Sequence, residues 1–159
     1  MRMSQSVEWS VHCCLALAWI ETDQPVSVAA LSTWFDLPRA YLNKGLQALV
    51  RAGILTSHPG LRGGFRLARP PEQITLLDIV VAHEGREDAF RCTEIRQRGS
   101  GVDPAAPEFR RACAVTTAMR KADLAWRREL AAQTVADLMA AAPQAAAART
   151  RRRHQSLRG

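Results

Sequence analysis

The sequence predicts a mainly α-helical fold with one small β-hairpin, and two observations carry this prediction. Apolar residues recur at intervals of three and four in the segments 4–20, 38–53 and 108–131, which is the spacing of amphipathic helices. After the second of these segments, two short runs of β-prone residues flank a stretch rich in glycine. With 159 residues and 47% hydrophobic content, the chain can bury one moderate core and retain an appendage or a dimer interface.

The first predicted helix, Ser4 to Ile20, carries two metal-ligating residue types on one face. Glu8 and His12 are four residues apart, so their side chains leave the helix on the same side, about one turn apart. The same pair also occurs on ordinary helix surfaces, where it stabilises the helix by only about 0.2–0.5 kcal/mol. Both interpretations remain open from the spacing alone.

The cysteines point to a reduced, cytoplasmic chain. Four cysteines are too few for a secreted disulfide scaffold of this length, and Cys13 and Cys14 are adjacent. Because neighbouring helical residues project about 100° apart, these two thiols cannot both face one metal, and we expect core packing for the one that shares the apolar face. The apolar run that they begin has eight residues, far short of the roughly 20 that span a membrane, and Glu8 before it argues against a signal peptide.

Two further helices follow, joined by a turn of three to four residues. The first runs from Val28 to Phe35 behind a Ser27 cap, and the second begins at Pro38 and ends at Gly53. Two short helices joined in this way indicate a helix-turn-helix, because the second displays amide and basic side chains opposite its leucines. Amides pair with adenine, and cations pair with guanine or phosphate. The candidate DNA contacts on this helix are Arg39, Ala40, Tyr41, Asn43, Lys44 and Gln47.

The hairpin comes directly after this helix, with predicted strands Ile54–Ser57 and Phe65–Ala68. In this position it is the wing of a winged helix-turn-helix, and Arg62 near its tip is a candidate for the minor groove. The charge agrees: residues 26–69 carry +5 and residues 143–159 carry +5, whereas the rest of the chain carries −3 of the total of +7. Such concentration is expected of a protein that meets nucleic acid at a defined face; the alternative is a solvated basic surface.

Beyond the hairpin, Thr75 and Asp78 form a predicted capping box for a helix from Leu76 to His83, which ends at Gly85. A polar loop then runs from Arg91 to Cys113, with Cys92 and Cys113 near its two ends. Compact domains rarely contain so long a structureless segment unless it is functional, so we expect a metal centre to hold it.

A long helix from about Glu108 to Ala131 follows the loop, with an apolar stripe of Val115, Met119, Ala122 and Trp126. A narrow stripe of this kind commonly pairs with its symmetry mate in a dimer, although it can also pack on its own domain. A short helix from Thr134 to Ala142 and a low-complexity basic tail, expected to be disordered, complete the chain.

Four segments are specific in combination: MRMSQSVEWSVH, RAYLNKGLQALVRAGIL, GLRGGFRLARPPEQITLLDIV and CTEIRQRG. Together they resemble the Rrf2 family of winged-helix transcription regulators, from about Met1 to Leu138. The resemblance implies a dimeric, DNA-binding regulator, and sensors of this family usually hold an iron–sulfur cluster through three loop cysteines. This chain departs from that pattern, because it has only Cys92 and Cys113, with Phe109 about where another cysteine would fall.

The resemblance further implies that Glu8 and His12 of the partner subunit complete a [2Fe–2S] site with Cys92 and Cys113. Such a cluster takes two protein ligands on each iron, and histidines are known to replace cysteines on one iron. A zinc ion would also accept two cysteines, a histidine and a glutamate, and a metal-free dithiol switch remains a third alternative. An enzyme with a cysteine nucleophile and His12 as base is a fourth, but no oxyanion loop or substrate motif accompanies it.

These elements divide the chain into four segments. Residues 1–85 form the predicted winged helix-turn-helix, residues 86–113 the cluster-binding loop, residues 114–142 the dimerisation helix with a short C-terminal helix, and residues 143–159 the disordered basic tail. The predicted function is that of a redox-sensing transcription regulator, and the predicted partners are double-stranded DNA and a second copy of the chain.

Overall fold

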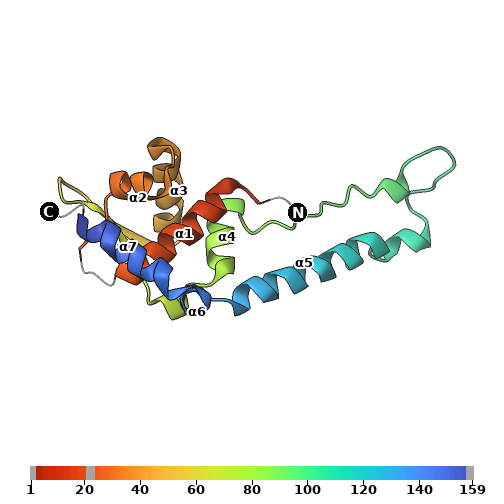
Figure 1. Cartoon of the computed structure of the whole chain (residues 1–159). Helices are drawn as coiled ribbons and strands as arrows, with labels where there is room; N and C mark the ends of the chain where they lie inside the picture. Colours follow the sequence, from red (N-terminus) through yellow and green to blue (C-terminus); the bar gives the residue numbers. More distant parts are fainter. Residues whose placement is uncertain (1–2, 21–23, 157–159) are drawn as a thin grey trace.

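The computed structural model describes residues 3–20 and 24–156 and has two parts, a helical body and a long arm that extends from it (Figure 1). The body comprises residues 3–20, 24–85 and 133–156, and the arm comprises residues 86–132. Its helices and strands are, in order, α1 (Gln5–Ile20), α2 (Val28–Phe35), α3 (Arg39–Arg51), β1 (Leu55–His58), β2 (Gly64–Leu67), α4 (Leu76–Glu84), α5 (Ala114–Ala132), α6 (Val135–Ala141) and α7 (Gln144–Ser156). Short 3-10 turns span Pro71–Gln73, Ile95–Gln97 and Pro107–Arg110. The predicted mainly helical fold with a two-stranded hairpin is confirmed.

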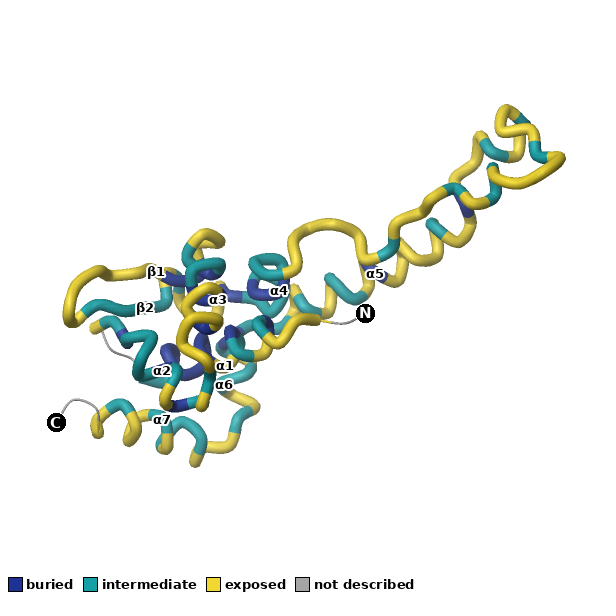
Figure 2. The backbone as a smooth tube through the Cα atoms, turned by 90° about the horizontal axis from the view of Figure 1, so that it is seen from above, coloured by how far each residue is buried: buried dark blue, intermediate teal, exposed yellow. Residues whose placement is uncertain are grey.

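The core of the body is built around α1, which packs against α3, α4, α6 and α7. The second half of α1 is buried on every side, because cysteine, leucine and alanine follow one another from position 13 to position 18 and run round the whole helix. The largest side chains of the core are less than 2% exposed or nearly so: Leu31, Leu42, Leu46, Leu49, Ile54, Leu55, Ile74, Ile79 and Val135. Figure 2 shows this buried centre where the helices of the body cross.

The helix-turn-helix forms where it was predicted. The Ser27 hydroxyl accepts the N–H of Ala30 at 3.1 Å and begins α2, which ends at Asp36 in a left-handed conformation (φ 51°). Pro38 occupies the N-cap of α3 and not its first turn, so α3 begins one residue later than expected. Gly53 takes the left-handed conformation (φ 68°) that the sequence indicated at the end of this helix.

The hairpin pairs Leu55 with Leu67 and His58 with Gly64 in antiparallel register, so β1 begins one residue later than predicted and β2 one residue earlier. The β1 shift has a local cause, because the Ile54 N–H still closes the end of α3 on the Leu49 carbonyl at 2.9 Å. Phe65 bonds to Val26 in both directions, at 2.8 and 3.0 Å, which ties the hairpin to the segment before α2. A side chain at Gly64 would collide with the Val26 carbonyl, so glycine is required there.

Two expectations for the C-terminal third were wrong. The long helix begins at Ala114 and not near Glu108, because Pro107–Arg110 form a 3-10 turn and Arg111 is extended. The tail, expected to be disordered, contains α7, which packs on α1. Alanine and arginine are among the best helix formers, and the low complexity of this segment hid that property. Within the described residues, no helix is both long and apolar enough to cross a membrane.

Candidate nucleic-acid interface and metal ligands

The outer face of α3 presents the predicted DNA contacts to solvent. Arg39, Ala40, Tyr41, Asn43 and Lys44 are exposed, Tyr41 to 69%, and Gln47 is half-buried. The opposite face carries Leu42, Leu46 and Leu49, which are at most 2% exposed. Burial of the leucines therefore determines which side of α3 faces outward, and polar and basic groups that can read a major groove lie on that side.

A polar contact that the sequence did not indicate lies beneath α3. Ser10 of α1 and His83 of α4 are joined by a hydrogen bond of 2.7 Å between Oγ and Nε2. Gly45 of α3 sits over this pair, where an added Cβ would lie 3.5 Å from the His83 ring. Burial lowers the pKa of His83, which the neighbouring Glu84 partly opposes. One junction thus joins α1, α3 and α4.

The wing is held at its base and free at its tip. Arg62 is exposed in the turn between β1 and β2, as predicted. At the base, Arg69 donates hydrogen bonds to the Gly53 carbonyl at 3.2 Å and to the Gln73 carbonyl at 3.1 Å, and lies 3.6 Å from the Asp78 carboxylate. Sequence reasoning counted Arg69 only as positive charge, because nothing local indicates that it ties α3 to α4.

Glu8 and His12 both lie exposed on α1, four residues apart, and the His12 ring lies 6.0 Å from the ring of Phe35. Cys13 and Cys14, which follow directly, lie on the buried side with no measurable exposure. Burial raises the pKa of Cys13 to about 12 and also raises that of Cys14. Such thiols stay protonated, which suits core packing and not metal binding.

The other two cysteines lie at the outer end of the arm, where α5 begins. Cys113 is the buried N-cap residue of α5, whereas Cys92 is exposed and accepts the Glu94 N–H at 3.4 Å. The backbone N–H groups of Thr116 and Val115, together with the Arg96 guanidinium, lower the pKa of Cys113. The thiolate form that a metal ligand requires is therefore favoured at this position.

Arg96 connects the two cysteine positions. Its guanidinium donates to Glu94 at 2.9 Å and to the Arg111 carbonyl at 3.4 Å, and it lies 5.5 Å from the ring centre of Phe109. Glu94 is the main cause of the raised pKa of Arg96, and both thiols add to it. Phe109 thus packs beside the arginine that organises the loop.

Within one chain the two ligand pairs do not meet. Glu8 and His12 lie on α1 in the body, whereas Cys113 caps the beginning of α5, the end of that helix that lies far from the body in Figure 1. Among the described residues, no group of three or more histidine, cysteine or carboxylate side chains could hold a metal ion. The donor types fit a cluster with two thiolates on one iron and a histidine and a carboxylate on the other, but a single chain supplies them as two separate halves.

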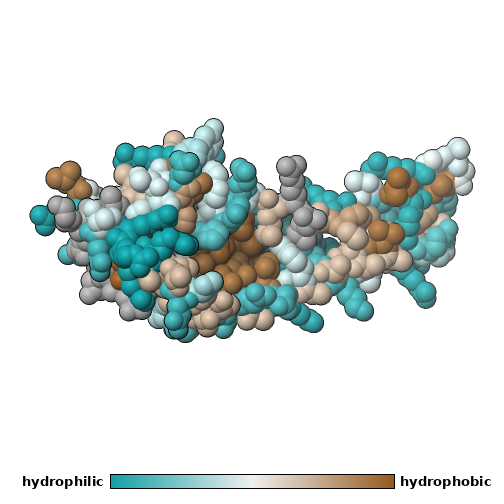
Figure 3. All heavy atoms as spheres, in the orientation of Figure 1, coloured by the Kyte–Doolittle hydropathy of each residue, from teal (hydrophilic) through white to brown (hydrophobic). Residues whose placement is uncertain are grey.

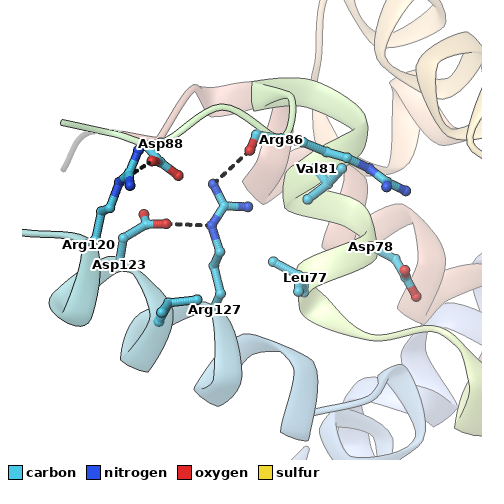
Figure 4. Close-up of a pocket in the computed structure, with 9 residues that line it drawn as sticks. Leu77, Asp78, Val81, Arg86, Asp88, Arg120, Asp123 and Arg127 are labelled. Carbon is cyan, nitrogen blue, oxygen red and sulfur yellow. Dashed lines mark hydrogen bonds and ion pairs between the residues drawn. The ribbon is translucent and has the colours of Figure 1, made fainter. Parts of the chain in front are cut away.

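Where the arm joins the body, a cavity of about 570 Å³ lies between α4 and α5, and most of the residues that line it are charged (Figure 4). Arg127 crosses it, because its guanidinium binds Asp123 at 2.6 Å and the carbonyls of Arg86 and Glu87 at 3.3 and 2.9 Å. Arg120 pairs with Asp88 at 3.3 Å on the outer side. These bonds fix the direction in which α5 leaves the body.

The apolar stripe of α5 is largely uncovered. Val115 is 58% exposed and Met119 is 43% exposed, and Leu124, which was not part of the predicted stripe, is 56% exposed. Figure 3 shows apolar surface along α5 and at the outer end of the arm. The alternative in which this stripe packs on its own domain is not what the structure has, apart from the half-buried Trp126.

Comparison with known proteins identifies the family. The Rrf2 family, described as "Iron-dependent Transcriptional regulator", matches residues 3–141. Protein rrf2 of Nitratidesulfovibrio vulgaris (strain Hildenborough) is 30% identical over 87% of each chain. Among solved structures, CymR, the global cysteine regulator of B. subtilis, has a TM-score of 0.67 and 22% identity over 90% of this chain and 99% of CymR. T. potens IscR has a TM-score of 0.65 and 22% identity over 91% of this chain and 90% of IscR. The chain belongs to the Rrf2 family of transcription regulators.

Proposed function

We propose that this chain is a dimeric DNA-binding regulator that senses redox state through a [2Fe–2S] cluster shared between subunits. The observation that carries the proposal is the separation of two ligand pairs, each accessible or poised for ligation, on two parts of one chain. Within the family we place it nearest the redox sensor RsrR, because of the segment from Glu8 to Cys14 and the loop from Cys92 to Gly99. In this proposal the protein regulates transcription and is not an enzyme.

DNA binding would use α3 in the major groove and the wing beside it. Asn43 and Gln47 are suited to adenine, and Arg39 and Lys44 to guanine or phosphate, on the face that burial of the leucines leaves outward. Ala40 and Tyr41 line the same face and would contact apolar base edges or the sugar–phosphate backbone. Arg62 at the tip of the wing would enter a narrow minor groove.

Dimerisation would bring the two halves of the site together. The exposed stripe of α5 is available to its symmetry mate, and a two-fold axis perpendicular to α5 would pair the two helices antiparallel, which carries the cysteine end of one arm toward the body of the partner. Cys92 and Cys113 of one chain would then hold one iron, while Glu8 and His12 of the other chain hold the second. Zinc in the same four positions and a dithiol switch of the two cysteines are the alternatives.

When bound, the cluster supplies a one-electron redox couple, so that reduction adds one negative charge at the site. Ser10 lies between the two α1 ligands in sequence and binds His83 directly behind Gly45 of α3. If a change at Glu8 and His12 displaced α1, the movement would therefore reach α3, the recognition helix, through the Ser10–His83 hydrogen bond and Gly45.

The test begins with anaerobically purified protein, which should be brown and lose its visible absorption with dithionite. Oxidised and reduced samples should then differ by at least several-fold in affinity for an operator-containing duplex, about 1–3 kcal/mol of coupling. Lys44→Ala is the control, because it should weaken both states by the same factor. Colourless protein loaded with zinc, or equal affinities of the two states with an intact cluster, would reject redox sensing.

A further inference from the structure

We propose that α7 is a further DNA-contacting element, which binds the phosphate backbone beside the wing. This inference rests on the proposed function, because it assumes that the body docks on DNA through α3 and the wing. It goes beyond that function, since α7 begins after residue 141, where the match to the family ends.

The charge of α7 is of one sign and lies partly on its outer side. The helix carries four arginines and no acidic residue, and Arg149 and Arg152 lie three positions apart on its exposed face. The half-buried residues of the helix include Ala146, Ala147, Ala148 and Thr150. Like charges three or four residues apart oppose helix formation, so this surface is best satisfied by an external polyanion. Figure 3 shows a strongly hydrophilic patch over α7.

Two other arginines of α7 anchor the helix through hydrogen bonds to backbone carbonyls. Arg151 donates to the Trp19 carbonyl near the end of α1 at 2.9 Å, and Arg153 donates to the Trp34 carbonyl near the end of α2 at 2.8 Å. The rings of Trp34 and His154 meet edge to face with centres 6.0 Å apart. These contacts hold α7 in one position against both helices, so its outer arginines are displayed from a fixed support.

That position is next to the wing. A surface hollow of about 490 Å³ is lined by His154 of α7, by Ser27 and Ala30 at the start of α2, and by Leu61, Arg62 and Gly63 at the tip of the wing. In Figure 2, α7 runs beside α2 toward the end of the body where the wing turns. When the wing tip reaches the DNA, α7 is therefore the neighbouring basic element, and phosphate is the group that arginine side chains would meet there.

The test compares the full-length dimer with the double variant Arg149→Gln/Arg152→Gln. Neither side chain makes a contact that packs the helix, and glutamine forms helices about as well as arginine. Arg128→Gln is the matched control, because Arg128 is exposed on α5, which leaves the body on the side away from the wing (Figure 1). Two duplexes of about 40 base pairs serve as probes, one enriched from a random pool by wild-type protein and one of random sequence.

We expect the double variant to bind both duplexes roughly tenfold or more weakly at about 0.1 M salt, with a salt dependence that is shallower by about 0.9 for each lost phosphate contact. The ratio of its affinities for the two duplexes should equal that of wild type, since phosphate contacts carry no sequence information. Arg128→Gln should leave affinity and slope unchanged.

The proposal for α7 is overturned if the double variant keeps wild-type helix content and its affinity depends on salt as steeply as that of wild type. It is also overturned if Arg128→Gln reduces the salt dependence as much as the double variant does. A loss confined to the enriched duplex also overturns it, because α7 would then read sequence. Failure of the proposed function would look different, because wild-type protein would then bind enriched and random duplexes equally well. The loss of affinity of the double variant for the random duplex would still test the role of α7.

Discussion

The body and the arm of this protein bury their side chains very differently. In the body, α1 to α4 share a core of leucine, isoleucine and cysteine side chains that are almost wholly removed from water. In the arm, residues 86–132, only Cys113 and Asp123 are buried. The body thus contains the apolar contacts that stabilise a fold, whereas the arm keeps its apolar side chains exposed. Large exposed apolar patches mark interaction surfaces, so the arm is built to be completed by a partner.

The arm is held by polar contacts instead. Arg127 and Asp123 form an ion pair of low exposure at its base, while the pairs Arg91–Glu87 and Arg120–Asp88 are exposed. Exposed pairs contribute only about 0–1 kcal/mol each, so they set the direction of the chain more than its stability. We infer that the body determines the stability of the fold and that the arm provides the surface for assembly. Equivalent substitutions in the body and in the arm test this division.

The largest expected effect comes from a cavity in the body. Leu46→Ala should lower the free energy of unfolding by about 2–5 kcal/mol, because Leu46 is fully buried and its removal leaves a void. The matched substitution in the arm, Leu124→Ala, should change the unfolding of the monomer by less than about 0.5 kcal/mol. Urea unfolding at low protein concentration measures the free energy of unfolding of both variants. Similar losses of stability for Leu46→Ala and Leu124→Ala would contradict the proposed difference between body and arm.

A smaller effect is expected from a charge placed on the stripe of the arm. Met119→Asp should weaken dimerisation at least tenfold, about 1.4 kcal/mol, and leave the unfolding of the body unchanged. Ala131→Asp, which is exposed and lies on the opposite side of α5, is the control and should dimerise nearly as wild type does. Sedimentation at a series of concentrations gives the dimer dissociation constants, and a Met119→Asp dimer of normal strength would place the interface elsewhere.

The smallest effect concerns the junction beneath α3. Because the pKa of His83 is lowered from its ordinary value of 6.5, the unfolded chain binds this proton more readily than the folded body. His83 should therefore contribute its full stability above pH 6.5 and lose part of it as the pH falls below 6.5. His83→Gln keeps a donor for Ser10 and should flatten this dependence, while His58→Gln on the exposed wing should not. The urea midpoints of wild type and both variants are measured at pH 5.5 and 7.5. The same change in midpoint between the two pH values for all three proteins would contradict the role given to His83.

Local signals made most of the body predictable. Ser27, Gly53 and the Thr75–Asp78 capping box act within a few residues of themselves, so the sequence was sufficient to place the helix ends that they define. The outward face of α3 was equally predictable, because the leucine spacing defines the buried side. The strand limits were off by one residue. At β1 the Ile54 N–H still closes the end of α3, and β2 is tied through Phe65 to Val26, which is distant in the sequence.

Contacts between distant segments could not be predicted. The Ser10–His83 bond, the ties of Arg69 and the packing of α7 on Trp19 and Trp34 depend on the tertiary arrangement. The candidate ligands were found from residue type and family resemblance, and their placement on two parts of the chain follows only from the structure. In the proposed dimer they combine between two chains, so the complete site is a property of the assembly and not of the sequence pattern of one chain.

The central claim, that body and arm of different chains share each cluster, is tested most directly with mixed dimers. One chain carries Glu8→Ala and His12→Ala, its partner carries Cys92→Ser and Cys113→Ser, and different affinity tags allow the mixed dimer to be isolated. Each doubly substituted homodimer is the control and should lack a native cluster under any arrangement.

The measurement is the iron and sulfide content of the folded mixed dimer, together with visible absorption that dithionite bleaches. If sites are shared, one site of the mixed dimer loses all four ligands and the other keeps all four, so the account predicts one cluster per dimer. If each chain provided its own four ligands, both sites would be damaged, and a mixed dimer without a cluster would contradict the account.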